Sequence, residues 1–190
     1  MKLAQLFTSD LRAVQKNDPA ARSYLETLLC HSPLHAIIIY RIANRLHLAG
    51  VPLVPRLLAT LAHTLTGVEI HPGAEIGHSF FIDHGTGVVI GETAKIGNHC
   101  ILFHNVTLGG TGKHHGKRHP TLQDHVFIGT SAILLGPLVV GHNSKVGANS
   151  FIIMHDVPPN CTVVGAPAKI VKENGYKVHK ELPKTIEDDE

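Results

Sequence analysis

The sequence predicts an α+β protein in which an N-terminal helical segment precedes a left-handed parallel β-helix built from hexapeptide repeats. Two periodicities lead to this prediction. Before residue 67, apolar residues recur every three or four positions, as in amphipathic helices. After residue 67, aliphatic residues recur every six positions, a period that neither α-helices nor ordinary β-hairpins produce. We therefore expect helices over residues 1–66, the β-helix over 67–171, and a C-terminal tail over 172–190.

Proline and glycine residues mark the expected helix boundaries in the first segment. A first amphipathic helix includes residues 3–14. Asp18 is expected to cap the start of a second helix, with Pro19 in its first turn. Ser32-Pro33 has the same pattern and is expected to open a third helix. A last helix covers about residues 56–66 and ends at a glycine.

The six-residue period is carried by aliphatic side chains that we expect to point into the β-helix. They are Ile70, Ile76, Ile82, Ile90, Ile96, Leu102, Leu108, Ile128, Leu134, Val140, Val146, Ile152 and Val164. A glycine often follows directly, and we expect it to turn the corner of a triangular coil. Three repeats complete a coil, so residues eighteen apart should stack at the strand spacing of about 4.8 Å.

The repeat is interrupted twice, and both interruptions are rich in polar residues. Two extra residues separate Ile82 from Ile90, around Asp83-His84. About a dozen more form an extruded loop, residues 109–121. Insertions on a solenoid often build its binding site, so we expect the chemistry of this protein at these two places.

Composition and charge exclude several classes of function. The formal net charge is +2 with histidine neutral, which gives no electrostatic reason to expect nucleic-acid or membrane binding. The longest apolar stretch, residues 36–40, is too short to cross a bilayer, and the N-terminus lacks a cleavable signal pattern. The three cysteines form neither a disulfide framework nor a zinc motif. We therefore expect a cytoplasmic protein.

Four residues are candidates for catalysis or substrate binding on residue type alone. An imidazole titrates near pH ~6.5, so His84 could act as a general base, although an exposed corner histidine is the equal alternative. Glu69 could orient that imidazole, or could be an ordinary strand residue. Arg118 and His119 end the long loop. They could grip a carboxylate or belong to a solvated basic loop.

The sixteen histidines also allow a metal-dependent interpretation. Some parallel β-helices carry zinc between subunits, and a zinc-dependent enzyme of the carbonic anhydrase type is therefore an alternative. No pair of histidines has a strong short metal-binding spacing, and ligands from different coils cannot be recognised in a sequence. We assign no metal ligands.

Four motifs together resemble the serine acetyltransferases of bacteria and plants, and the resemblance covers nearly the whole chain. The motifs are Asp83-His84-Gly85-Thr86-Gly87, Gly109-Gly110-Thr111-Gly112-Lys113, Arg118-His119-Pro120 and Gly165-Ala166-Pro167-Ala168-Lys169. The last motif is shared widely among hexapeptide acyltransferases, whereas the first two are specific to the serine enzymes. A hexapeptide acetyltransferase that acts on a sugar is the alternative within this fold.

The resemblance implies a reaction and a role for each site residue. An acetyl group would pass from acetyl-CoA to the hydroxyl of L-serine, giving O-acetylserine and CoA in the first step of cysteine biosynthesis. His84 would be the base, paired with Glu69 where the family usually has Asp. Asp18 and Asp83 would bind the serine amino group, and Arg118 and His119 the rest of the amino acid. The residues expected to line the acetyl-CoA groove between subunits are Gly110, Thr130, Ala148 and Lys169.

The resemblance also implies partners. We expect a homotrimer, with a hexamer as the larger alternative, and L-cysteine as a feedback inhibitor in the serine pocket. No metal is expected. The family's tail often ends in isoleucine and inserts into O-acetylserine sulfhydrylase. This chain instead ends in Glu187-Asp188-Asp189-Glu190, which argues against that complex.

Overall fold

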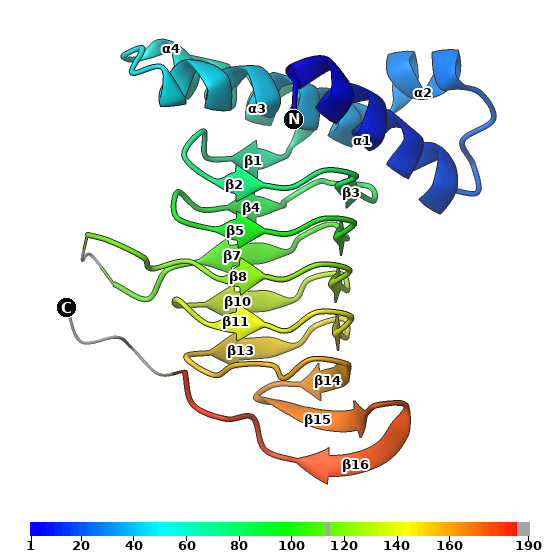
Figure 1. Ribbon diagram of the computed structural model, residues 1–190, viewed down its shortest axis with the longest axis vertical. Coiled ribbons are helices and arrows are strands. Elements are labelled where there is room, and N and C mark those ends of the chain that lie inside the picture. The colour runs from blue at the N-terminus through cyan, green and yellow to red at the C-terminus, as the bar shows by residue number, and fades with distance from the viewer. Residues whose placement is uncertain (113–114, 186–190) are drawn as a thin grey trace.

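The computed structural model describes residues 1–112 and 115–185 (Figure 1). Four helices, α1 (Leu3–Asn17), α2 (Tyr24–Cys30), α3 (Ser32–Leu48) and α4 (Val54–Thr66), lie across one end of a column of short strands. None of the helices in the described ranges is both long and apolar enough to span a membrane. The α+β class and the order of its two parts are confirmed.

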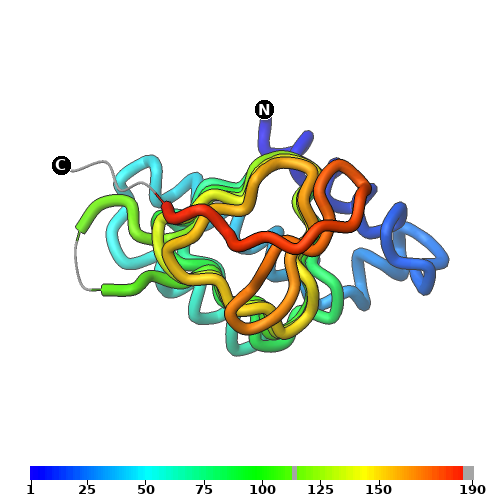
Figure 2. The backbone as a smooth tube through the Cα atoms, turned by 90° about the horizontal axis from the view of Figure 1, so that it is seen from below, coloured from blue at the N-terminus to red at the C-terminus, as the bar shows by residue number. Residues whose placement is uncertain are grey.

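The strands of the coils pair in parallel and form three faces that give the column a triangular cross-section (Figure 2). Face A contains β1 (Glu69–Ile70), β4 (Val89–Ile90), β7 (Thr107–Gly109), β10 (Ile133–Leu135) and β13 (Phe151–Ile153). Face B contains β2 (Glu75–Ile76), β5 (Lys95–Ile96), β8 (Thr121–Leu122) and β11 (Val139–Val140). Face C contains β3 (Phe81–Ile82), β6 (Ile101–Leu102), β9 (Phe127–Ile128), β12 (Lys145–Val146) and β14 (Cys161–Gly165).

The chain runs from face A to B to C in each coil of this left-handed β-helix, so three corners run along the column. The A/B corner contains residues 71–74, 91–94, 110–112, 115–120 and 136–138. The B/C corner contains residues 77–80, 97–100, 123–126 and 141–144. The C/A corner contains residues 83–88, 103–106, 129–132 and 147–150. The first sequence interruption lies in the C/A corner, and the second lies in the A/B corner.

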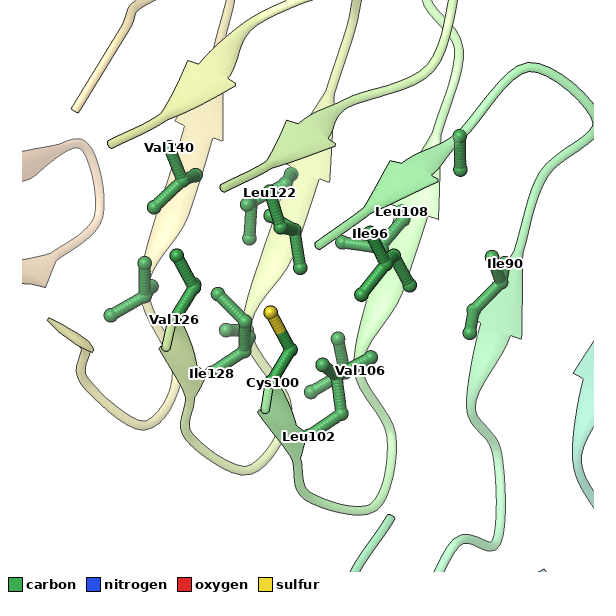
Figure 3. Close-up of a cluster of buried hydrophobic side chains, with 14 of the residues drawn as sticks. Ile90, Ile96, Cys100, Leu102, Val106, Leu108, Leu122, Val126, Ile128 and Val140 are labelled. Atoms are coloured by element: carbon green, nitrogen blue, oxygen red, sulfur yellow. The ribbon is translucent and has the colours of Figure 1, made fainter. Parts of the chain in front are cut away.

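The repeated aliphatic side chains fill the interior of the column, as predicted (Figure 3). On face A, for example, Ile90 pairs with Leu108, which pairs with Leu134. Val164 is the exception, because Val163 pairs with Val146 and is buried while Val164 is exposed. The last coil is one residue shorter than eighteen, and this shifts the inward position from Val164 to Val163.

The glycine that follows many aliphatic residues does not turn the corner, contrary to the prediction. A Cβ atom on Gly77 would lie 2.7 Å from the carbonyl oxygen of Gly97 in the next coil. These glycines therefore permit close stacking of neighbouring coils. The left-handed backbone conformation occurs two residues after the glycine, at positions such as His99, Asn143 and Asn149. Asn and His are among the non-glycine residues that adopt this conformation most readily.

Three further expectations are corrected by the structure. Asp18 does not begin a helix: it follows α1, its carboxylate accepts the N–H of Ala20 at 2.8 Å, and Ser23 caps α2 instead. Residues eighteen apart were expected to stack, which would pair Glu69 with residue 87, but the two-residue insertion moves its strand partner to Val89. The side chain of Ser32 does not cap α3, because His31 fills that position and Nδ1 of His31 accepts the N–H of Leu34.

A buried ion pair joins the helices to the first coil. The guanidinium group of Arg41 on α3 donates to the carboxylate of Asp10 on α1, with Nε and Oδ2 3.1 Å apart. Arg41 also donates to the carbonyl oxygens of Ile76 and Gly77, each at 2.5 Å. Oδ1 of Asp10 accepts the N–H of Phe80 at 3.0 Å. The position of α1 and α3 over the column therefore depends on charged groups as well as on apolar packing.

The opposite end of the column is closed by the C-terminal part of the chain (Figure 1). Strands β15 (Ala168–Glu173) and β16 (Tyr176–Lys180) continue face C in antiparallel order, so β15 crosses the boundary expected at residue 171. Residues 183–185 then pair with 154–156 of the last coil. The acidic residues 186–190 lie outside the described part of the chain.

Candidate active site

His84 projects from the C/A corner because the two-residue insertion widens the turn between β3 and β4. Its φ of 60° lies in the left-handed region, and its side chain is 73% exposed. Nε2 lies 3.9 Å from Oδ1 of Asp83, so a protonated His84 would form an ion pair with this neighbour. A Cβ on Gly85 would lie 2.8 Å from side-chain atoms of Pro33 and Val68, so glycine lets the turn pack under α3. The backbone at His84 is thus held by packing, while its imidazole is exposed and accessible to a ligand.

A column of polar side chains continues from His84 along the C/A corner. The ring of His104, one coil further, meets the His84 ring edge to face at 5.6 Å between centroids. Nε2 of His104 lies 2.6 Å from Oγ1 of Thr130 in the following coil. Nδ1 of His104 is buried and has no partner among the described residues. Sequence reasoning did not place His104 beside His84, although the insertion puts these residues one coil, or twenty positions, apart.

Two more of the residues expected in the acetyl-CoA groove lie along this corner. Ala148 follows Thr130 by one coil, and its backbone nitrogen would lie 2.7 Å from a Cβ on Gly129. The turn between β14 and β15 comes next, where Lys169 pairs with Val164 in the strand register. The ammonium group of Lys169 lies 2.7 Å from Oε1 of Glu181. The structure thus brings Thr130, Ala148 and Lys169 to one side of the column.

Asp18 and Asp83 come from different elements but act on the same half-buried side chain. His31, at the start of α3, lies near both carboxylates: burial lowers its pKa, and the charges of Asp18 and Asp83 oppose that shift. Its ring centroid lies 6.0 Å from that of Phe81. Sequence reasoning did not single out His31. Its signal was only its position before Ser32-Pro33, which indicates a helix cap.

Glu69 is exposed on β1 and is not in contact with His84. Within the described part of the chain, its carboxylate forms no hydrogen bond or ion pair with that imidazole, and Asp83 is the carboxylate nearest to Nε2 of His84. The predicted dyad is therefore not assembled in this structure, although both residues lie beside the C/A corner.

Arg118 and His119 lie in the A/B corner, where a loop projects from the side of the column (Figure 2). Arg118 forms an ion pair with Glu92, and this hydrogen bond holds the pKa of Glu92 below its usual value. Gly110 lies against the same segment, since a Cβ there would be 3.2 Å from the carbonyl oxygen of Arg118. The adjoining Lys113 and His114 lie outside the described residues.

Lys117 fixes the base of this loop. Its ammonium group donates to the carbonyl oxygens of Thr93, His119 and Pro120, at 2.8, 2.5 and 3.2 Å. Burial lowers the pKa of Lys117 to about 8, and the neighbouring charge of Lys95 acts in the same direction. Lys117 thus ties the backbone that follows Arg118 to Thr93 in the neighbouring coil.

The candidate residues form two groups that one chain does not bring together. His84 and Asp83 precede the face A strand β4, whereas Glu92, which holds Arg118, follows it. The strand separates the two corners by about 10 Å of extended backbone, at ~3.3 Å per residue. One group carries a possible base and carboxylates, and the other carries a guanidinium and an imidazole suited to an anionic ligand.

A metal centre gains no support from these side chains. Over residues 1–112 and 115–185, no group of three or more His, Cys, Asp or Glu side chains is arranged to hold a metal ion. Along the B/C corner, the ring of His78 meets that of His99 edge to face, and His99 stacks on His125, with centroids 4.8 and 4.9 Å apart. These three rings form no group arranged to hold a metal ion.

The chain is similar over most of its length to curated serine acetyltransferases. It is 50% identical to the serine acetyltransferase of Bacillus subtilis over 189 aligned residues, and the alignment covers 97% of this chain and 87% of the relative. The identity to the Synechococcus elongatus protein is 48% over 179 residues, which cover 92% of this chain and 73% of the relative. The Helicobacter pylori protein is 48% identical over 164 residues, with 86% and 95% covered. No protein-family model matches the chain.

Solved structures of serine acetyltransferases share the fold. Soybean serine acetyltransferase complexed with serine superposes with a TM-score of 0.85 at 44% identity, covering 89% of this chain and 69% of that one. The Neisseria gonorrhoeae enzyme superposes with a TM-score of 0.86 at 41% identity, covering 93% of this chain and 67% of that one. A serine acetyltransferase in complex with cysteine gives 0.87 at 39% identity, with 90% and 70% covered. With these identities over nearly its full length, the chain belongs to the serine acetyltransferase family.

Proposed function

We propose that this protein transfers an acetyl group from acetyl-CoA to the hydroxyl of L-serine, giving O-acetylserine and CoA, in the cytoplasm and as the first step of cysteine biosynthesis. One observation carries the proposal: the exposed imidazole of His84 stands beside the Asp83 carboxylate at an interruption of the coil. This arrangement suits a base that acts on the hydroxyl of a substrate bearing an ammonium group. A relative at 44% identity was solved with serine.

The reaction follows from the chemistry of the two corners. Asp83 and Asp18 bind the ammonium group of serine, and Arg118 exchanges part of its contact with Glu92 for the serine carboxylate. His84 takes the proton of the serine hydroxyl while the hydroxyl oxygen attacks the thioester carbon of acetyl-CoA. The tetrahedral intermediate collapses by breaking the carbon–sulfur bond, and the imidazolium returns the proton to the departing thiolate. Glu69 would reach the imidazolium only after a change in side-chain conformation.

A homotrimer would bring the two corners together, and the outward surface of face A supports this assembly. Its side chains are mostly apolar, namely Val89, Ile133, Leu135, Phe151 and Ile153, with Glu69 and Thr107 as polar members. Ile133 and Ile153 are 38% and 39% exposed in the single chain. If face A of each chain lies toward a threefold axis, the C/A corner of one chain meets the A/B corner of the next.

This assembly also gives the acetyl-CoA groove two walls. Thr130, Ala148 and Lys169 would come from one subunit and Gly110 from its neighbour. L-Cysteine differs from L-serine only in sulfur for oxygen and would compete as a feedback inhibitor in the same pocket, as the cysteine complex of a relative supports. A hexamer is the alternative assembly.

Serine-dependent release of CoA from acetyl-CoA, followed with a thiol reagent, tests the proposed reaction. We expect release with L-serine and no release above background without an acceptor or with a panel of sugars. Release with a sugar but not with serine would replace the acceptor, and release with none of them would contradict acetyl transfer.

Co-expression of two inactive variants tests the shared site. His84→Asn and Arg118→Ala chains, expressed in equal amounts, should assemble trimers with about a quarter of the wild-type sites intact, because each site takes one corner from each of two neighbours. Arg118→Ala with His119→Ala is the matched control, since both changes affect the same corner and should not complement. Activity no higher than that of either variant alone would contradict a site between subunits.

A further inference from the structure

Thr93 lies in the A/B corner and makes four polar contacts with the segment that carries Arg118 and His119. Its Oγ1 accepts the backbone N–H of Arg118 at 2.9 Å and that of His119 at 3.1 Å. The same oxygen lies 2.9 Å from Nδ1 of His119. The backbone N–H of Thr93 also donates to Nδ1 of His119, at 3.2 Å.

These contacts determine which ring nitrogen of His119 carries the proton. A backbone N–H can only donate, so Nδ1 must be unprotonated to accept it. The two backbone N–H groups occupy both acceptor sites of the Thr93 hydroxyl, so its own proton is directed to Nδ1. A neutral His119 therefore carries its proton on Nε2.

The surroundings of His119 keep the ring neutral and fixed. Burial lowers the pKa of His119, and the charges of Arg118 and Lys117 lower it further. The residue is only 8% exposed, and its ring packs on Gly91, where a Cβ would lie 2.0 Å from Cδ2. Nε2 has no protein partner among the described residues and remains available.

We propose that Thr93 is a positioning residue that fixes His119 with its proton on Nε2, so that His119 faces the substrate only as a hydrogen-bond donor. This inference rests on the proposed function and deepens it. His119 would donate to an anionic oxygen of the substrate beside Arg118, and it cannot take a proton from the serine hydroxyl. The base must then be another imidazole, which leaves that role to His84.

The test combines nitrogen NMR of ¹⁵N-histidine-labelled protein with serine kinetics. The spectrum of His119→Gln identifies the His119 signals by their loss. In the wild type we expect the pattern of a neutral ring protonated on Nε2. Thr93→Val should admit part of the tautomer with the proton on Nδ1, because only the backbone N–H of residue 93, at 3.2 Å, then donates to the ring. It should also lower kcat/KM for serine by roughly tenfold, because it leaves two backbone amides without an acceptor.

Two variants separate this role from a general packing effect. Thr93→Ser keeps the hydroxyl and should restore the wild-type spectrum and bring kcat/KM to within about twofold. Thr162→Val, on face C and away from both corners, should change neither measurement. If Thr93→Val does not fold, Thr93→Ala replaces it.

Two results would overturn the inference: a wild-type spectrum with the proton on Nδ1 or on both nitrogens at neutral pH, or a Thr93→Val protein with wild-type spectrum and kinetics. The failure of the proposed function would look different. The wild type would then release no CoA with serine, while the spectra would still decide the tautomer.

Discussion

Replacing His84 by asparagine is expected to lower serine-dependent CoA release by roughly a hundredfold or more, because the reaction loses its general base. Asparagine suits the test because it tolerates the left-handed backbone of this residue, with its φ of 60°, and cannot take up the proton. The measurement is kcat with saturating serine and acetyl-CoA. The fold should be retained, since the side chain of His84 is largely exposed.

His125→Asn is the matched control for this change. His125 has the same φ of 60° and is also exposed, but it lies in the B/C corner, away from both groups of candidate residues. We expect its kcat to stay within about twofold of the wild type, because surface changes away from the site usually have small effects. A His84→Asn protein with near-normal kcat would remove His84 from the mechanism.

Replacing Arg41 by methionine is expected to lower the free energy of unfolding by about 3–5 kcal/mol, the usual cost of removing one partner of a buried ion pair. The change leaves the fully buried carboxylate of Asp10 without its counter-charge and the carbonyl oxygens of Ile76 and Gly77 without a donor. Burial already raises the pKa of Asp10, so the carboxyl group is expected to take up a proton in the variant, which limits the loss.

Urea unfolding at a fixed protein concentration measures this effect, since the stability of an oligomer depends on concentration. Arg45→Met is the control: Arg45 lies on the same helix but is exposed, and its side chain bonds only the backbone oxygen of Met1 among the described residues. Its free energy of unfolding should change by no more than about 0.5 kcal/mol. Equal losses in both variants would show that the buried pair has no special part in holding α1 and α3.

The sequence determined the architecture because an aliphatic residue repeated at a fixed period indicates a buried position repeated in every coil. The inward positions from Ile70 to Ile152 alternate with outward residues at a fixed period, and each inward side chain needs the coil above and below it for burial. The two interruptions were visible as counts of residues, and they contain His84 and Arg118. The end of α4 also followed from a local signal, since Gly67 takes the left-handed conformation directly after this helix.

Local patterns were misleading where a tertiary contact decided the outcome. Asp18-Pro19 resembles a helix start, but α1 ends there, and Asp18 instead approaches His31. Glycine after an aliphatic residue suggested a turn, yet Gly77 is required by the close approach of the next coil. Val163 replaces Val164 in the core because a coil one residue short changes which side chains face inward.

The candidate site needed both levels of description. The sequence identified His84, Asp83, Arg118 and His119 as chemical groups, since their types and neighbours are local properties. Only the tertiary structure showed that the first two and the last two occupy different corners, and that Thr93 fixes the His119 ring. The reason is physical: hydrogen bonds and ion pairs join residues on neighbouring coils, about twenty positions apart, and their partners depend on the length of each insertion in between.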